Sequence, residues 1–120
     1  MTRDEHEAQL RAEAHGEVPP MPGVYALAWP EAPDQYVYVG ASQNLHGRSC
    51  DYAAGLGKYG RSPLSVALKE RFRRRLPPPL FVVLARCESK AHAHATERKL
   101  IRAAAERGHP LLNVCHRGMA

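Results

Sequence analysis

Residues 23–48 constrain the fold most strongly, because they combine two strand-length segments with a turn and the start of a helix. Residues 23–29 alternate bulky and small apolar side chains, a period-two pattern that indicates a β-strand. Two prolines and an aspartate then supply turn chemistry. Residues 36–39 resume the strand pattern, and strict alternation places Tyr36 and Tyr38 on one face. The segment therefore predicts a β-hairpin.

A helix is expected directly after the hairpin, at about residues 43–54. Either Ser42 or Asn44 has a side chain suited to cap its N-terminus. Arg48 and Tyr52 are four residues apart, which places them on the same helix face. The hairpin and this helix would gather three tyrosines and one arginine, and such a group predicts a functional site.

Two further helices and a strand are expected downstream. A Ser-Pro pair at residues 62–63 is a helix start, and the apolar stripe that ends at Phe72 is expected to face the core. The apolar run at residues 80–85 predicts a third strand that is buried on both faces. The last helix is expected at about residues 90–107, with Ser89 as its N-terminal cap. Glu97 is the polar exception on its inward stripe, so it needs a cation or a hydrogen-bond donor; a structural ion pair with an arginine is one interpretation.

These elements predict an α/β (α+β) fold, in which a small three-stranded antiparallel sheet is flanked by helices. Two strands come from the hairpin and one from residues 80–86. At 120 residues the chain has room for a single core. We therefore expect one domain at residues 20–120, preceded by a peripheral helix or arm at residues 1–19.

Charge is distributed unevenly along the chain. Residues 1–20 contain two arginines and five carboxylates, whereas the remainder contains fifteen basic and seven acidic residues. A cationic domain favours a polyanionic partner such as a nucleic acid. Cations at a helix C-terminus also complement the helix dipole, which explains part of the arginine run in structural terms. The candidate nucleic-acid contacts are Lys58, Arg61, Arg71, Arg73, Arg74 and Arg75.

Membrane and secretory signals are absent from the sequence. No apolar run approaches the roughly 20 residues that cross a bilayer, and the charged N-terminus lacks the apolar core of a secretory signal. The three cysteines are scattered and form no C-x-x-C pair, as is typical of ordinary thiols in a reducing compartment. We therefore expect a cytoplasmic protein without a membrane partner.

Five features, in order along the chain, resemble the GIY-YIG nuclease superfamily. The two halves of the motif are present as Gly-Val-Tyr at residues 23–25 and Tyr-Val-Gly at residues 38–40. Arg48 follows the second glycine by eight residues, Glu97 lies in a downstream helix, and Asn113 follows the last helix. The resemblance spans nearly the whole chain and implies the GIY-YIG nuclease fold, here in what we expect to be a stand-alone, single-domain member.

The resemblance implies a metal-dependent DNA endonuclease that leaves 5′-phosphate and 3′-hydroxyl ends. Tyr25 and Tyr38 are the candidates for the base that activates water, and we favour Tyr38, with Tyr25 positioning the water. A tyrosine, with an ordinary pKa of about 10, needs a nearby cation to ionise at neutral pH. Arg48 and Tyr52 would hold the scissile phosphate. Glu97 would hold one Mg²⁺ or Mn²⁺, hard ions that prefer oxygen ligands.

Three other motif positions are expected to be structural. The resemblance implies that Gly23 and Gly40 allow close backbone approach, and that Asn113 fixes the segment after the last helix. Ala41 departs from the family pattern, since many members carry Lys or Ser there. His92 and His94 are two positions apart on a helix, so we expect them to be exposed rather than to share a metal ion.

Two other functions remain open at this point. One is a catalytically idle nucleic-acid-binding module of the same fold, and the other is a module that recruits a protein partner through the acidic N-terminal arm. The sequence favours DNA as the partner but leaves open whether the DNA is single-stranded, nicked, branched or duplex. It equally leaves open a role in repair, recombination, defence or a mobile element.

Overall fold

A computed structural model of the chain describes residues 18–55 and 60–113. Lys58, a candidate nucleic-acid contact, lies outside these ranges, as does the predicted arm at residues 1–19 except for its last two residues. None of the described helices is long and apolar enough to cross a membrane. In chain order the described elements are β1 (Gly23–Ala28), β2 (Tyr36–Ser42), α2 (Leu45–Ala53), α3 (Pro63–Arg73), β3 (Leu80–Arg86) and α4 (Lys90–Glu106).

The strands form one antiparallel sheet in the order β2-β1-β3, which confirms the predicted fold class. The central strand is β1, and all six of its residues are buried. The strand predicted at residues 80–85 is β3, and the prediction that it is buried on both faces is confirmed in part. Its side chains pack into an apolar core on each face of the sheet. Its second half is only partly buried, because β3 is an edge strand with a hydrogen-bonded neighbour on one side alone.

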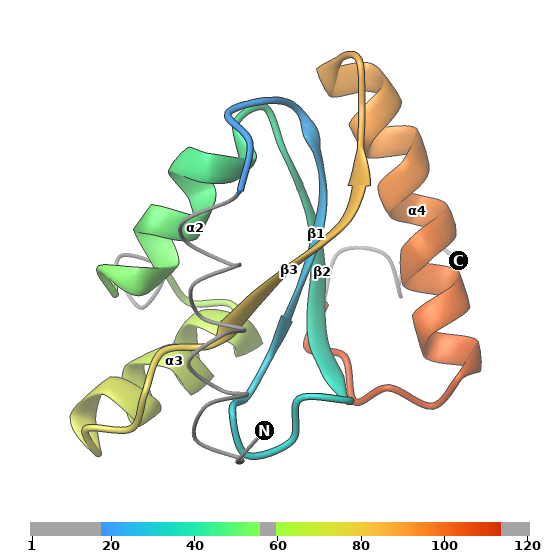
Figure 1. The fold of residues 1–120 in the computed structure, drawn as a ribbon. Coiled ribbons are helices and arrows are strands. Elements are labelled where there is room, and N and C mark those ends of the chain that lie inside the picture. Colours follow the sequence, from blue (N-terminus) through green and yellow to red (C-terminus); the bar gives the residue numbers. More distant parts are fainter. Residues whose placement is uncertain (1–17, 56–59, 114–120) are drawn as a thin grey trace, which may run out of the picture.

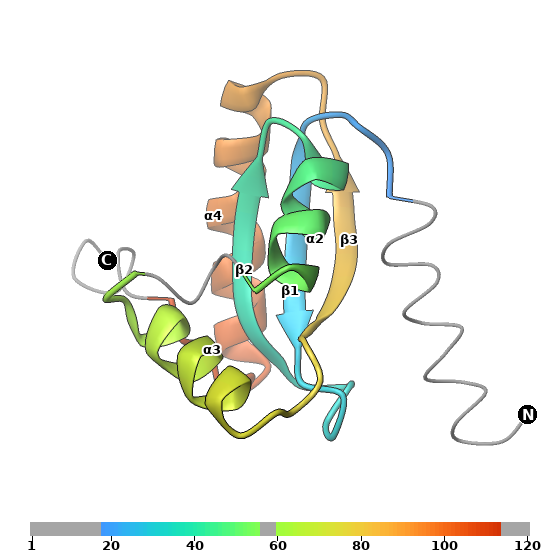
Figure 2. The same ribbon diagram turned by 90° about the vertical axis from the view of Figure 1, so that its left-hand side faces the viewer.

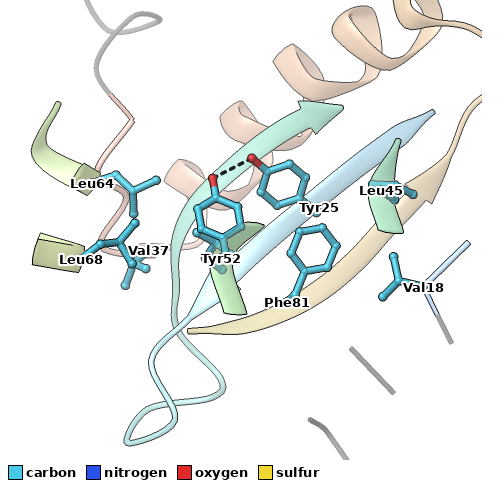
Figure 3. Packing of buried hydrophobic residues seen from close by; sticks show 9 residues of the cluster. Val18, Tyr25, Val37, Leu45, Tyr52, Leu64, Leu68 and Phe81 are labelled. Atoms are coloured by element: carbon cyan, nitrogen blue, oxygen red, sulfur yellow. Dashed lines mark hydrogen bonds between the residues drawn. The ribbon is translucent and has the colours of Figure 1, made fainter. Parts of the chain in front are cut away.

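Helices cover both faces of the sheet, α2 and α3 on one face and α4 on the other (Figures 1 and 2). Each face has its own apolar core. Tyr25 and Leu27 of β1 pack beneath α2, whereas Val24 and Ala26 pack against α4. The alternation of bulky and small residues in β1 therefore has a physical role, because the small side chains face the long helix. Figure 3 shows the core on the α2 side, to which Val18, Tyr25, Val37, Leu45, Tyr52, Leu64, Leu68 and Phe81 contribute.

A bulge in β2 alters the faces of its tyrosines. The register between β1 and β2 shifts between Leu27 and Ala28, which pair with Tyr38 and Tyr36, so Val37 is an extra residue in β2. Tyr38 consequently packs with the core on the α2 side, and Tyr36 packs with the core on the α4 side. The prediction that both tyrosines share one face is wrong, because strict alternation does not hold across a bulge.

Side-chain caps begin the helices, as the sequence predicted. Asn44, rather than Ser42, caps α2, and its Oδ1 accepts a hydrogen bond from the Gly47 amide at 3.1 Å. Ser62 caps α3 in the same way. The expectation that Phe72 faces the core is wrong. Its side chain is 59% exposed, because the last turn of α3 borders an open hollow between the ends of α2 and α3.

Candidate active site

Three tyrosines from three elements converge on the α2 side of the sheet. The Tyr25 ring centroid lies 6.2 Å from that of Tyr38 and 5.8 Å from that of Tyr52. Tyr25 stacks on Phe81 of β3 at 4.6 Å. The hydroxyl oxygens of Tyr25 and Tyr52 are 2.9 Å apart, within hydrogen-bond distance (Figure 3). The sequence predicted the cluster of tyrosines but gave no indication of the Phe81 contact, which joins residues 56 positions apart.

The absence of a side chain at Gly40 makes this convergence sterically feasible. Gly40 pairs with Tyr25 across the sheet. A Cβ atom at position 40 would lie 2.6 Å from the Tyr25 hydroxyl and 2.7 Å from Cε2 of Tyr38. Gly23 meets a similar constraint, because a Cβ there would collide with the backbone carbonyl of Ala85. Both motif glycines thus permit close approach, one of aromatic rings and one of neighbouring strands.

Burial holds two of the three phenols in the neutral form. It raises the pKa of Tyr25 far above its ordinary value, and the neighbouring Tyr52 and Tyr38 raise it further, while Arg48 acts in the opposite direction. Burial also raises the pKa of Tyr52, and there the hydrogen bond with Tyr25 and the charge of Arg48 oppose the rise. Neither hydroxyl ionises near neutral pH. Tyr38 is only partly buried.

Arg48 lies on α2 one turn before Tyr52, and its charge acts on both Tyr25 and Tyr52. Its side chain is 46% exposed, and its guanidinium lies 4.0 Å from the Asp51 carboxylate, a distance that makes a weak ion pair. The structure therefore brings four predicted residues together, and the arginine among them remains open to an incoming anion.

Glu97 lies on α4, the helix on the opposite face of the sheet from α2. Its side chain is 13% exposed, and its Oε1 lies 3.8 Å from Nδ1 of His94. Within residues 18–55 and 60–113, no group of three or more His, Cys, Asp or Glu side chains is placed to hold a metal ion. Among the described residues, Glu97 would therefore be the one carboxylate ligand of a divalent ion bound there.

A polar cleft of about 570 Å³ extends between α2 and α4 at the end of β2. Arg48 and Asp51 line it from α2, and Lys90 and His94 line it from α4. His94 is thus part of the cleft wall and also a neighbour of Glu97, so the cleft connects the arginine side of the site with the glutamate side. The predicted exposure of His94 is confirmed at 48%. Its position was not anticipated, although its spacing of three residues from Glu97 was a usable signal.

The arginine run at the C-terminal end of α3 contains residues with different partners. Arg71 donates two hydrogen bonds to the Glu31 carboxylate, at 2.7 and 2.8 Å, and lies 4.4 Å over the Trp29 ring, so it has a structural partner within the protein. Arg73 pairs with Glu70. Contact of these two residues with nucleic acid stays a prediction, as it does for the exposed Arg61, Arg74 and Arg75.

A second hollow, of about 490 Å³, lies between the ends of α2 and α3 beside this run. Its lining includes Tyr52, Phe72 and the prolines at positions 77–79, and it is mainly apolar. Arg71, Arg73 and Arg75 also line this hollow, but no carboxylate does. The polar cleft combines cations with the Asp51 carboxylate, and its wall residue His94 lies beside Glu97. The cleft between α2 and α4 is therefore the better candidate for the chemistry that the sequence predicts.

Asn113 fixes the segment after α4 to β2. Its Oδ1 accepts from the Val39 amide at 3.1 Å, and its Nδ2 donates to the Val39 carbonyl at 2.7 Å. This side chain therefore completes the edge-strand hydrogen bonds that β2 would otherwise leave open next to Tyr38.

Comparisons with known proteins agree with this architecture. No family model matches the chain. Over 49 residues the chain is 47% identical to UvrABC system protein C of Acidothermus cellulolyticus, a stretch that covers 41% of this chain and only 7% of that relative. The fold is similar to the crystal structure of the GIY-YIG N-terminal endonuclease domain of UvrC from Thermotoga maritima, bound to its catalytic divalent cation, magnesium. The TM-score is 0.52 at 18% identity, over 88% of this chain and 97% of that one.

Proposed function

We propose that this chain, whose fold is that of the GIY-YIG endonuclease domain, is a divalent-metal-dependent DNA endonuclease. The observation that carries the proposal is the convergence of three tyrosine rings with an exposed arginine at the start of α2. The fold likeness supports the proposal, because the similar structure is an endonuclease domain bound to a catalytic cation. An exposed thiol at Cys50 fits the reducing cytoplasm that we propose as its location.

Tyr38 is proposed as the general base. Burial and neighbouring phenols hold Tyr25 protonated, so Tyr25 is suited to donate a hydrogen bond and to orient a water molecule rather than to remove its proton. Tyr38 lies beside Tyr25 but is partly exposed, and so is more accessible to the attacking water. These environments divide the two roles between two otherwise similar phenols.

Arg48 is proposed to bind the scissile phosphate. Its guanidinium is exposed to the polar cleft, and the planar fork of arginine matches two phosphate oxygens. Negative charge develops on the phosphoryl oxygens during attack, so a positioned cation stabilises the transition state more than the ground state. Tyr52 would contribute by fixing the Tyr25 hydroxyl, on which the charge of Arg48 acts, through their hydrogen bond.

Glu97 fits a divalent cation of the Mg²⁺ or Mn²⁺ type. A single, partly exposed carboxylate suits ions that keep several water ligands and take the rest from substrate oxygens. The ion, when bound, would supply Lewis-acid stabilisation of the phosphate and of the leaving oxygen. The contribution of the chain itself is to hold the carboxylate on a rigid helix next to the cleft.

DNA cleavage with matched variants tests the proposal. Labelled single-stranded, nicked, four-way-junction and duplex DNAs are incubated with the full chain and Mg²⁺, Mn²⁺ or chelator. We expect metal-dependent cleavage to 5′-phosphate and 3′-hydroxyl ends, with limited sequence specificity. Glu97→Gln and Arg48→Ala should each reduce the rate by at least about 100-fold. Glu106→Gln and Arg102→Ala, which change exposed charges on α4, serve as controls.

The outcome separates the enzyme from the idle module. Equal cleavage by Glu97→Gln, Arg48→Ala and the unmodified chain would reject the proposed site and point to a contaminating nuclease. Metal-independent DNA binding without cleavage by any variant would favour the catalytically idle module. A role for the acidic N-terminal arm in recruiting a protein partner stays a proposal, because that segment lies outside the described residues.

A further inference from the structure

The polar cleft has a second wall with basic residues, which the proposed mechanism does not use. Lys90 and His94 lie four residues apart on α4, so both project from one side of that helix, and both line the cleft opposite Arg48. The one carboxylate in the lining is Asp51, which already lies 4.0 Å from Arg48. The α4 wall therefore carries a basic side chain that no acidic group of the lining balances.

The position of Lys90 is unfavourable for the helix itself. It is the first residue of α4, directly after the capping residue Ser89, and the first turn of α4 contains no acidic residue. A helix N-terminus carries partial positive charge, so aspartate or glutamate stabilises it and lysine opposes it. The α4 wall thus concentrates positive charge at one end of the cleft without benefit to helix stability, and a bound anion would relieve it.

We propose that Lys90 and His94 bind the DNA phosphate next to the one held by Arg48, so that the cleft holds the strand at two points. This inference rests on the proposed function and adds two binding residues to it. The two walls come from helices on opposite faces of the sheet, which would align the backbone between Arg48 and the carboxylate of Glu97.

Metal-free DNA binding tests the proposal separately from catalysis. The affinity of the full chain for a labelled oligonucleotide is measured in chelator over a range of salt concentrations, with Lys90→Ala, His94→Gln and Lys99→Ala as variants. Lys99 lies nine residues beyond Lys90, which places it on the opposite side of α4, and it does not line the cleft. We expect Lys90→Ala to reduce the slope of log affinity against log salt by about 0.7 to 0.9. Lys99→Ala should leave the slope unchanged.

A double variant that moves the positive charge to another position in the cleft provides a second test. Ala41 lines the same cleft from the end of β2, so a lysine there would place an ammonium group in it. Ala41→Lys combined with Lys90→Ala should restore the salt slope of the unmodified chain. Thermal unfolding of Lys90→Ala serves as the structural readout, and we expect its Tm to be equal or higher, because the charge opposes the helix dipole.

Cleavage kinetics separate this inference from the proposed function. With Mg²⁺ present, Lys90→Ala should raise KM with kcat within about twofold, as expected for a contact made equally in ground and transition states. If Lys90→Ala and His94→Gln match Lys99→Ala in both salt slope and KM while the unmodified chain cleaves DNA, the second phosphate contact is rejected and the enzyme stands. If the unmodified chain neither binds nor cleaves DNA, both proposals are rejected.

Discussion

The hydroxyl of Tyr25, on the central strand, lies 2.9 Å from the hydroxyl of Tyr52, on α2, and both side chains are buried. Replacing either tyrosine by phenylalanine leaves the other hydroxyl in the core without this partner. We expect Tyr25→Phe and Tyr52→Phe each to lower the free energy of unfolding by about 1 to 2 kcal/mol. The double variant should be less destabilised than the sum of the two, as measured by urea unfolding in a double-mutant cycle.

Cleavage by the tyrosine variants distinguishes the positioning residue from the base. Tyr38→Phe should reduce kcat by about 10² to 10⁴-fold. Tyr25→Phe should reduce kcat less, because the attacking water would be less well oriented but the general base Tyr38 would still be present. Circular dichroism and urea unfolding control for folding. A larger loss of kcat in Tyr25→Phe than in Tyr38→Phe, with both variants folded, would reverse the assignment.

Alkaline pH should destabilise the fold through the same tyrosines. The pKa values of Tyr25 and Tyr52 are raised in the folded state, so the folded chain binds these protons more tightly than the unfolded chain does. The stability they contribute is fully present below the ordinary tyrosine pKa of about 10 and is lost as pH rises above it. Urea unfolding from pH 8 to pH 11 should show this fall, and the Tyr25→Phe, Tyr52→Phe double variant should show a shallower one.

Local chemistry made much of the fold predictable from the sequence. Helix starts depend on one side chain and the amides just after it, so the caps at Ser62 and Ser89 were identifiable without tertiary information. The choice between Ser42 and Asn44 needed the structure, because both are suitable residues within one turn. The two motif tyrosines and Arg48 were placed correctly near one another because the hairpin and α2 are adjacent in the chain.

Features that depend on distant partners were not predictable. The bulge at Val37, and hence the opposite faces of Tyr36 and Tyr38, follows from the register with β1 rather than from the pattern of β2 itself. The edge position of β3 depends on which strand pairs with the second side of β1, and the local sequence of β3 does not specify this. The contact between Arg71 and Glu31 joins residues 40 positions apart, so the sequence pattern of the arginine run did not reveal this structural partner.

Gly40→Ala should damage both stability and activity. The added methyl group would lie within 2.8 Å of the Tyr25 ring and hydroxyl and 2.7 Å from Tyr38, so the rings must separate. We expect a loss of about 1 to 3 kcal/mol in the free energy of unfolding and a marked fall in kcat. Gly47→Ala is the control, because its methyl group meets mainly the amide end of Asn44 at 3.0 Å and alanine favours the helix. Equal effects of the two substitutions would argue against a steric role for Gly40.

The Glu31 and Arg71 pair should stabilise the fold in a pH-dependent way. The hydrogen bonds from Arg71 hold the pKa of Glu31 below its ordinary value. Glu31 is 54% exposed, so solvent screening limits the effect of Glu31→Gln to about 0.5 to 1 kcal/mol. Because the folded-state pKa is depressed, this difference is present above about pH 4.3 and disappears as pH falls through the folded-state value. Urea unfolding of both proteins at pH 7 and pH 3 measures it.

Arg75 occupies a backbone conformation that glycine normally adopts. Its φ is +57°, and it follows α3 in a turn where the Leu76 amide donates to the Arg71 carbonyl and the Arg75 amide donates to that of Phe72. A side chain costs about 1 kcal/mol in this region, so Arg75→Gly should raise the free energy of unfolding by somewhat less than that amount. If the exposed guanidinium contacts DNA, Arg75→Gly should weaken DNA binding and lower the slope of log affinity against log salt concentration. Arg75→Asn, which also tolerates positive φ, controls for the loss of charge alone. A stabilised variant with unchanged DNA affinity would assign Arg75 no role in binding.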